Sequence, residues 1–138
     1  MNNKDRTRAK SLLAEAYRRN PAVSQYAQDY CRVLMEDKEY QKVKEVAGPF
    51  LQTEKQFDFL LYLGQASQAL GELAEAIVRF KEYLDHFGAN ISVLNSVGDC
   101  YYQLGNWEEA RIAWQRSLEI SPKQEEVEKK LDSLKEKK

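Results

Sequence analysis

The second half of the chain repeats itself with a period of 34 residues, so that residues 57–90 align with residues 91–124. Self-similarity at a fixed period of this length indicates that one supersecondary unit stacks on the next. The repeat therefore restricts the fold more strongly than any single motif does. The like-for-like pairs are Leu60/Leu94, Leu63/Val97, Gly64/Gly98, Leu70/Leu104, Gly71/Gly105, Leu73/Trp107, Glu75/Glu109, Ala76/Ala110, Val78/Ile112, Phe80/Trp114 and Leu84/Leu118.

Each repeated unit has the pattern of two helices joined by a glycine turn. Ala76, Phe80 and Leu84 recur at i, i+4 and i+8, which places them on one face of a helix. Gly71 follows the end of the preceding helix, where the backbone commonly takes a left-handed conformation that glycine tolerates. The chain is therefore predicted to be all-α. We expect helices at 4–19, 22–37, 39–52, 54–70, 73–87, 91–104, 107–120 and 123–136.

Local signals predict where several helices begin or break. Thr53 with Gln56, and Ser121 with Gln124, have the spacing of capping boxes at helix N-termini. Pro49 lacks a backbone N–H, and its ring crowds the carbonyl four residues earlier. We therefore expect a kink or a break in the helix predicted over 39–52.

One motif links these patterns to a known family. The segment Gly98-x2-Tyr101-x3-Gly105-x4-Ala110-x3-Trp114-x7-Pro122 resembles the signature of the tetratricopeptide repeat. The resemblance implies tandem antiparallel helix pairs that stack as a right-handed superhelix, an α-solenoid. We expect a single tetratricopeptide-type domain over 1–138. Its parts are an N-terminal unpaired helix (1–21), a degenerate repeat (24–56), two repeats (57–90 and 91–124) and a C-terminal capping helix (125–138).

Composition and charge disfavour several classes of protein. The formal net charge is −1 and the isoelectric point about 5.9, which disfavours nucleic-acid binding. The longest uncharged run, 59–71, is shorter than the ~20 apolar residues that cross a bilayer, and no apolar leader opens the sequence. We therefore expect a soluble protein without membrane insertion. Its default compartment is the cytoplasm, unless a signal preceded Met1.

The sequence contains few residues of the types that commonly act in catalysis. The single histidine, His86, lies in the last turn of a predicted helix, where it interacts well with the helix C-terminus. Cys31 and Cys100 lie on first helices two repeats apart, on the order of 20 Å from each other by helix-stacking distances, and a disulfide needs Cα atoms within ~7 Å. We expect both thiols to be buried and free. The sequence thus predicts no enzyme, no cofactor and no metal site.

The family resemblance implies a partner-binding groove. In tetratricopeptide proteins successive first helices line a concave face that holds an extended peptide or a helix. The matching positions here are rich in amides, hydroxyls and tyrosine, which can pair with a peptide backbone. We expect the side chain of Asn95 to point away from the helix–helix core. The candidate groove residues are Gln28, Arg32, Asp58, Leu61, Tyr62, Gln65, Gln68, Asn95, Asp99 and Tyr102.

These observations predict a non-catalytic scaffold or adaptor for protein–protein interaction. Arg32 is the only cation among the groove residues, so the partner is expected to be neutral or basic. An alternative is a self-association module, since Leu12, Leu13 and Tyr17 on the first helix have no helix before them; a weak homodimer is then expected. A further alternative is a tetratricopeptide domain of a larger protein.

Overall fold

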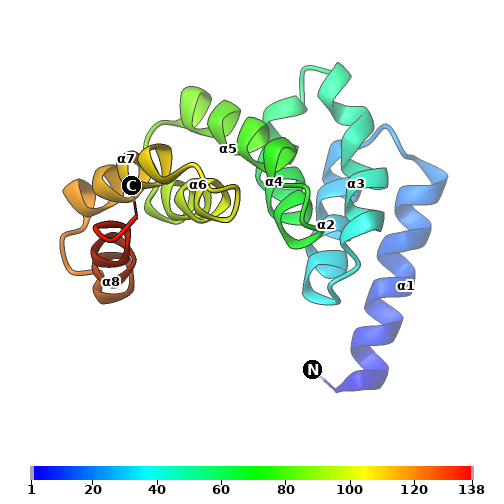
Figure 1. Cartoon of the computed structure of the whole chain (residues 1–138). Helices are drawn as coiled ribbons and strands as arrows, with labels where there is room; N and C mark the ends of the chain where they lie inside the picture. The colour runs from blue at the N-terminus through cyan, green and yellow to red at the C-terminus, as the bar shows by residue number, and fades with distance from the viewer. Residues whose placement is uncertain (1, 138) are drawn as a thin grey trace. The chain divides into compact units, whose positions relative to one another are not determined.

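The computed structural model describes residues 2–137, and all the regular structure in them is helical (Figure 1). The all-α prediction is confirmed, and its helix ranges agree with the structure to within a few residues at most ends. The elements are α1 (Asn3–Arg19), α2 (Ser24–Glu36), α3 (Tyr40–Ala47), η1 (a 3₁₀ helix, Gly48–Gln52), η2 (3₁₀, Gln56–Phe59), α4 (Leu60–Ala69), α5 (Leu73–Phe87), α6 (Ile91–Gln103), α7 (Trp107–Ile120) and α8 (Glu125–Leu134).

The chain divides into two compact units between Leu70 and Gly71. The first unit holds α1–α4 and the second holds α5–α8. The boundary falls inside the predicted repeat 57–90. The prediction of one domain over 1–138, with its inner boundaries, stays a prediction.

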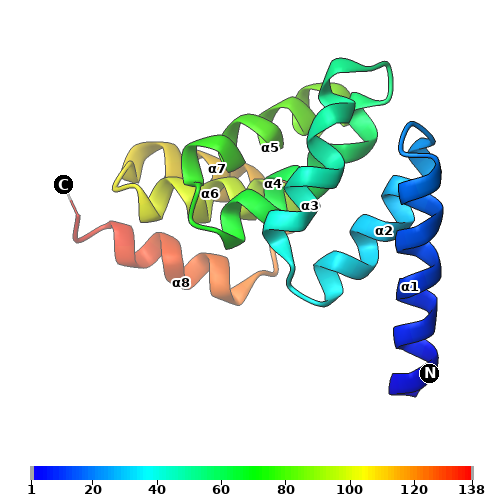
Figure 2. The same ribbon diagram turned by 90° about the vertical axis from the view of Figure 1, so that its right-hand side faces the viewer.

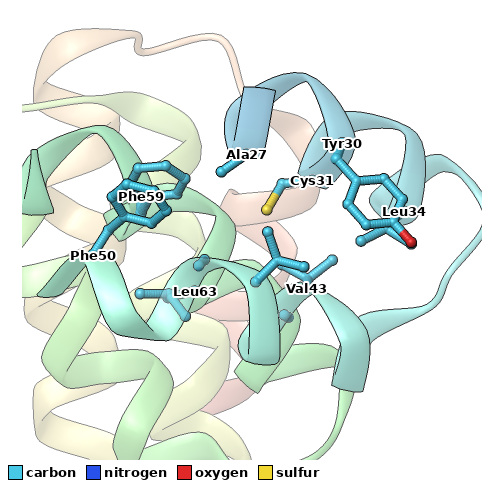
Figure 3. Packing of buried hydrophobic residues seen from close by; sticks show 11 residues of the cluster. Ala27, Tyr30, Cys31, Leu34, Val43, Phe50, Phe59 and Leu63 are labelled. Atoms are coloured by element: carbon cyan, nitrogen blue, oxygen red, sulfur yellow. The ribbon is translucent and has the colours of Figure 1, made fainter. Parts of the chain in front are cut away.

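In the first unit each helix packs against the next, with α1 along α2, α2 against α3 and α3 against α4 (Figure 2). The core of this unit is a continuous apolar cluster, and the thiol of Cys31 lies near its centre, facing Val43 (Figure 3). The rings of Phe50 and Phe59 stack with centroids 4.2 Å apart, which joins the two 3₁₀ helices. The cluster consists of Ala27, Tyr30, Cys31, Leu34, Val43, Val46, Ala47, Phe50, Phe59, Leu63 and Ala66.

The break expected at Pro49 is confirmed. Helix α3 ends at Ala47 and the chain continues as a 3₁₀ helix that contains the proline. The capping box predicted at Thr53 is wrong. Its hydroxyl accepts a hydrogen bond from the N–H of Lys55 (3.1 Å) and donates one to the carbonyl of Phe50 (2.8 Å), so it closes a turn and caps no helix.

The turn between the two helices of each pair needs a left-handed residue. Gly71 and Gly105 hold this position with φ of 79° and 81°, as the sequence pattern predicts. At the matching place between α2 and α3 the residue is Lys38, with φ of 59°. A residue with a Cβ is strained in this conformation, so this turn carries a cost that the other two do not.

In the second unit α6 packs against both α5 and α7, and α8 packs against α7. Trp114 is 1% exposed and lies over Gly98. Together with Ala110 it forms a cluster with Val127 and Leu134 of α8. Helix α8 is thus attached to α7 through these apolar side chains.

The second predicted capping box is also wrong, because Gln124 reaches back to α7. Its Nε2 donates to the carbonyl of Ser121 (2.9 Å), to the carbonyl of Ser117 (3.1 Å) and to the hydroxyl of Ser117 (3.0 Å). Ser121 closes α7, with its own N–H bonded to the carbonyl of Ser117. Helix α8 begins only at Glu125.

Candidate partner-binding surface

In the first unit the predicted groove residues lie on α2 and on the η2–α4 segment, and α2 contacts α4. The fold therefore brings this set together within one compact unit. Arg32, Asp58 and Gln65 are exposed, and the other members are half-buried. From α2 come Gln28 and Arg32; from η2 and α4 come Asp58, Leu61, Tyr62, Gln65 and Gln68.

Tyr62 anchors this surface to the core of the first unit. Its ring packs on the apolar cluster, and burial raises the pKa of its hydroxyl above the ordinary value. The nearby groups Cys31, Arg32 and Asp29 have smaller effects on the same pKa. Tyr62 of α4 therefore faces α2, beside the charged residues Asp29 and Arg32.

Three amides on this surface remain open. The side chains of Gln28, Gln65 and Gln68 form no hydrogen bond within residues 2–137. A primary amide offers two donors and an acceptor. These side chains are therefore available to the N–H and C=O groups of a bound chain.

Arg32 lies where α2 meets α1. Its guanidinium is 4.0 Å from the carboxylate of Asp29, and its side chain is largely exposed. It borders a cleft of about 340 Å³ between the two helices. The other lining residues of this cleft are Arg6, Ala9, Lys10, Leu13, Val33 and Glu36.

In the second unit the three predicted groove residues on α6 contact α7, α8 or the residue that precedes α8. Nδ2 of Asn95 donates to Oε1 of Gln124 (2.9 Å). The ammonium of Lys130 donates to Asp99 (2.9 Å). The side chain of Tyr102 packs against Trp107, with ring centroids 5.2 Å apart.

The expectation that the side chain of Asn95 points away from the helix–helix core is therefore wrong. Its amide is half-buried and bonded to the residue that precedes α8, and its Oδ1 is buried without a partner in the described part of the chain. The sequence signal for this contact is weak, because Gln124, three residues after Ser121, has the spacing of a capping residue. Lys137, which lies over the ring of Tyr102 (5.6 Å), was likewise not predicted as a contact.

The structure contains another cleft, at residues that the sequence did not indicate as a site. A cleft of about 330 Å³ lies among α5, α6 and α7, lined by apolar side chains and by charged side chains of both signs. One lining residue is Lys81, whose ammonium lies 5.3 Å from the ring centroid of Tyr101. The lining residues are Lys81, Leu84, Asp85, Leu94, Val97, Tyr101, Glu109, Ile112, Ala113 and Arg116.

The two thiols are buried and free, as predicted. Burial raises the pKa of Cys31 to about 12 and that of Cys100 to about 11. Both are therefore protonated and poor nucleophiles at neutral pH. Within residues 2–137 no group of three or more His, Cys, Asp or Glu side chains is placed to hold a metal ion, and no helix there has the length and apolar character to span a bilayer.

Comparison with known proteins agrees with the fold. Residues 91–124 match the family model described as tetratricopeptide repeat. The comparison with curated proteins found no match. Among solved structures, MamA AMB-1 superposes with a TM-score of 0.76 at 22% identity, over 83% of this chain and 68% of that one.

Two further structures are similar. The MamA RS-1 ArsTM double mutant gives a TM-score of 0.82 at 16% identity, over 91% of this chain and 71% of that one. A tetratricopeptide repeat protein from Parabacteroides merdae ATCC 43184 gives 0.75 at 20% identity, over 90% of this chain and 50% of that one. The chain therefore has the tetratricopeptide repeat fold, and its residues 91–124 are a tetratricopeptide repeat.

Proposed function

We propose that this chain is a non-catalytic scaffold that binds a peptide or a helix of a partner protein through the predicted groove residues. The open part of this groove is the surface on α2 and η2–α4 in the first unit. The tetratricopeptide fold supports an interaction role, since its first helices carry the partner-facing side chains in the family that the sequence resembles.

The observation that carries the proposal is the combination of open amides with a fixed aromatic ring. Gln28, Gln65 and Gln68 have unused hydrogen-bonding capacity, and Tyr62 is held by the core beside them. An extended peptide presents an N–H and a C=O group at every residue, and each must find a partner when it is desolvated. Amides matched to a rigid tyrosine provide such partners at low entropic cost.

The charge of the surface favours a neutral or basic partner. Asp58 is exposed and Asp29 lies beside Tyr62, whereas Arg32 is the only cation among the groove residues of the first unit. In the second unit the carboxylate of Asp99 is paired with Lys130. The preference therefore rests on the aspartates of the first unit.

The groove residues on α6 can bind a partner only if their present contacts are replaced. Asn95, Asp99 and Tyr102 contact Gln124, Lys130 and the indole of Trp107. A partner reaches these side chains only by replacing part of those contacts. We therefore place the main binding energy on α2 and α4.

The experiment uses a partner obtained by affinity purification and the synthetic peptide that carries its binding segment. Isothermal titration calorimetry compares the wild type with Gln65→Ala. Because Gln65 is exposed, the folded structure tolerates the change, and binding should weaken by about 1–3 kcal/mol as a desolvated peptide group loses its mate.

Gln115→Ala is the matched control, since Gln115 is an exposed glutamine on α7. It should bind as the wild type does. If Gln65→Ala and Tyr62→Ala both bind like the wild type while Gln115→Ala does not, the groove assignment is wrong. A Lys substitution at Asp58 should also move the preference from basic toward acidic peptides.

A further inference from the structure

The rings of Tyr102 on α6 and Trp107 on α7 form an aromatic corner beside the segment that follows α8. Their centroids are 5.2 Å apart and their planes meet at 66°. Both side chains are half-buried and pack against the apolar cluster of α7 and α8. The two rings are therefore held in place, and each keeps part of its surface open to solvent.

A cation already lies in the aromatic corner. The ammonium of Lys137 is 4.6 Å from the ring centroid of Trp107 and 5.6 Å from that of Tyr102. Both distances are within the ~6 Å over which the face of an aromatic ring attracts a cation. The aromatic corner therefore has the geometry of a cation site that is built from two ring faces.

The rings, and no carboxylate, attract this cation. Within residues 2–137 the side chain of Lys137 forms no ion pair. Lys130 differs in this respect, because its ammonium lies 5.8 Å from the ring centroid of Trp114 and also 2.9 Å from the carboxylate of Asp99. An anion thus holds Lys130 in its place, whereas the ammonium of Lys137 rests on aromatic faces alone.

The side chain of Lys137 can leave the aromatic corner while α8 stays in place. The helix ends at Leu134 and is attached through the buried side chains of Val127 and Leu134. The turn after the helix is closed by the backbone N–H of Lys137, which bonds to the carbonyl of Leu134 (3.1 Å). Neither contact involves the ammonium, so a second cation can displace it without unfolding the helix.

The repeat itself does not require these two rings. At the matching positions 34 residues earlier the chain has Gln68 and Leu73. Leu73 begins α5 as Trp107 begins α7, so a leucine is sufficient at the start of this helix. The aromatic corner is therefore present in the repeat 91–124 and has no counterpart in the repeat 57–90.

We propose that the aromatic corner of Tyr102 and Trp107 binds an arginine side chain of a partner protein, which takes the place of Lys137. A guanidinium is planar, stacks on aromatic faces and is more weakly hydrated than an ammonium. A site made of ring faces therefore suits arginine better than lysine. The inference rests on the proposed function only in that the arginine belongs to a partner protein, and it agrees with the basic partner proposed above.

Lys137 is then an internal competitor for the partner. A cation–π contact at an exposed site has a free energy that corresponds to about a two- to fivefold change in an equilibrium constant. The lysine therefore lowers the affinity for an external cation by about this factor. A neutral side chain gains nothing from displacing it, so the competition favours partners that carry arginine.

The probes are three acetylated and amidated tripeptides, with arginine, lysine or citrulline between two glycines. Citrulline has the shape of arginine without its charge. The full chain, labelled with nitrogen-15, is titrated with each peptide at neutral pH, and NMR spectra follow the indole N–H signals. The chain has two tryptophans, and Trp107→Phe identifies the signal that belongs to Trp107.

Four variants are titrated in the same way. Lys137→Gln removes the cation from the aromatic corner, and Tyr102→Leu removes one ring, with the circular dichroism spectrum and melting temperature as checks of folding. Lys135→Gln is the matched control for charge, since Lys135 is an exposed lysine that lies 3.3 Å from the carboxylate of Asp132. Gln65→Ala changes the groove on α2 and α4.

We expect the arginine peptide to shift the Trp107 signal to saturation, the lysine peptide to bind more weakly and the citrulline peptide to leave the signal in place. Lys137→Gln should bind the arginine peptide about two- to fivefold more tightly, and Tyr102→Leu about two- to fivefold more weakly. Lys135→Gln and Gln65→Ala should bind it as the wild type does. Because the probe does not need the groove, the groove proposal and this one can fail separately.

Three results would overturn the inference. A citrulline peptide that shifts the Trp107 signal as the arginine peptide does would show that the aromatic corner does not select a cation. Equal affinities of Lys137→Gln and Lys135→Gln would show that Lys137 does not compete for the site. An affinity that Tyr102→Leu leaves unchanged would show that the arginine binds elsewhere.

Discussion

Gly98 of α6 and Trp114 of α7 lie in direct contact, and the indole occupies the space that a side chain at position 98 would need. A Cβ atom on Gly98 would lie 2.8 Å from Cε2 of Trp114 and closer still to Nε1 and Cδ1. The indole is 1% exposed. It therefore has little room to move away.

Gly98→Ala should destabilise the fold by about 1–3 kcal/mol, because the indole must shift within a packed core. Trp114→Ala removes the same contact from the other side and should cost about 3–5 kcal/mol. Urea unfolding followed by circular dichroism measures both. Gly48→Ala is the control, since a Cβ there meets nothing within 4 Å; an equal loss at Gly48 and Gly98 would refute the packing argument.

Lys38→Gly should stabilise the chain. The left-handed backbone costs an L-residue roughly 1–2 kcal/mol, and glycine loses about 0.5–1 kcal/mol more conformational entropy on folding, which leaves a gain of about 0.5–1 kcal/mol. Thermal unfolding should show a higher midpoint. Lys42→Gly, at an exposed place in α3, should lower the midpoint, because glycine is a poor residue in a helix interior. A lower midpoint for both variants would contradict the strain at Lys38.

Gln124→Ala should loosen α8. The side chain makes hydrogen bonds to Asn95, Ser117 and Ser121 at 2.9–3.1 Å, and its removal leaves partly buried groups unpaired. We expect a loss of about 1–3 kcal/mol. Hydrogen exchange should rise most in α8, with Lys123→Ala as the neighbouring control. Unchanged protection of α8 would show that the apolar contacts of Val127 and Leu134 hold the helix alone.

Acid should weaken the attachment of α1. A hydrogen bond from Lys10, helped by the charges of Lys10 and Arg6, holds the pKa of Asp37 below its ordinary value of 3.8. The carboxylate therefore contributes stability that is present above about pH 4 and is lost as the pH falls through the lower, folded-state pKa.

The measurement compares the melting temperatures of the wild type and Asp37→Asn across this range. The wild type should melt higher at neutral pH, and the difference should shrink below about pH 4 as Asp37 takes up a proton. The contribution is modest because the group is exposed. A difference that stays constant down to about pH 2 would exclude the ion pairs as its cause.

The elements that the sequence predicted well are those that depend on local periodicity. The stripe of Ala110 and Trp114, the left-handed turns at Gly71 and Gly105, and the break at Pro49 each follow from a few neighbouring residues. Their physical causes act within one or two helical turns, so a single sequence contains them. This is why the repeat and most helix ranges could be predicted.

The predictions that are wrong concern side chains that bond to a residue distant in the sequence. Gln124 has the spacing of a capping residue, but it bonds to Asn95 and Ser117, which no local pattern indicates. Asp99 is likewise predicted on an open face, but it pairs with Lys130, a lysine whose place in the sequence looks like that of a solvated residue. In the first unit the candidate groove residues stay a prediction.

The boundary between Leu70 and Gly71 does not coincide with the repeat. An engineer who shortened this protein by whole repeats would cut after Asn90 and separate α5 from α6, against which it packs. A cut in the turn at Gly71 keeps every helix with the neighbours of its own unit. For truncation, insertion or domain fusion, the packing unit and not the sequence period is the module to conserve.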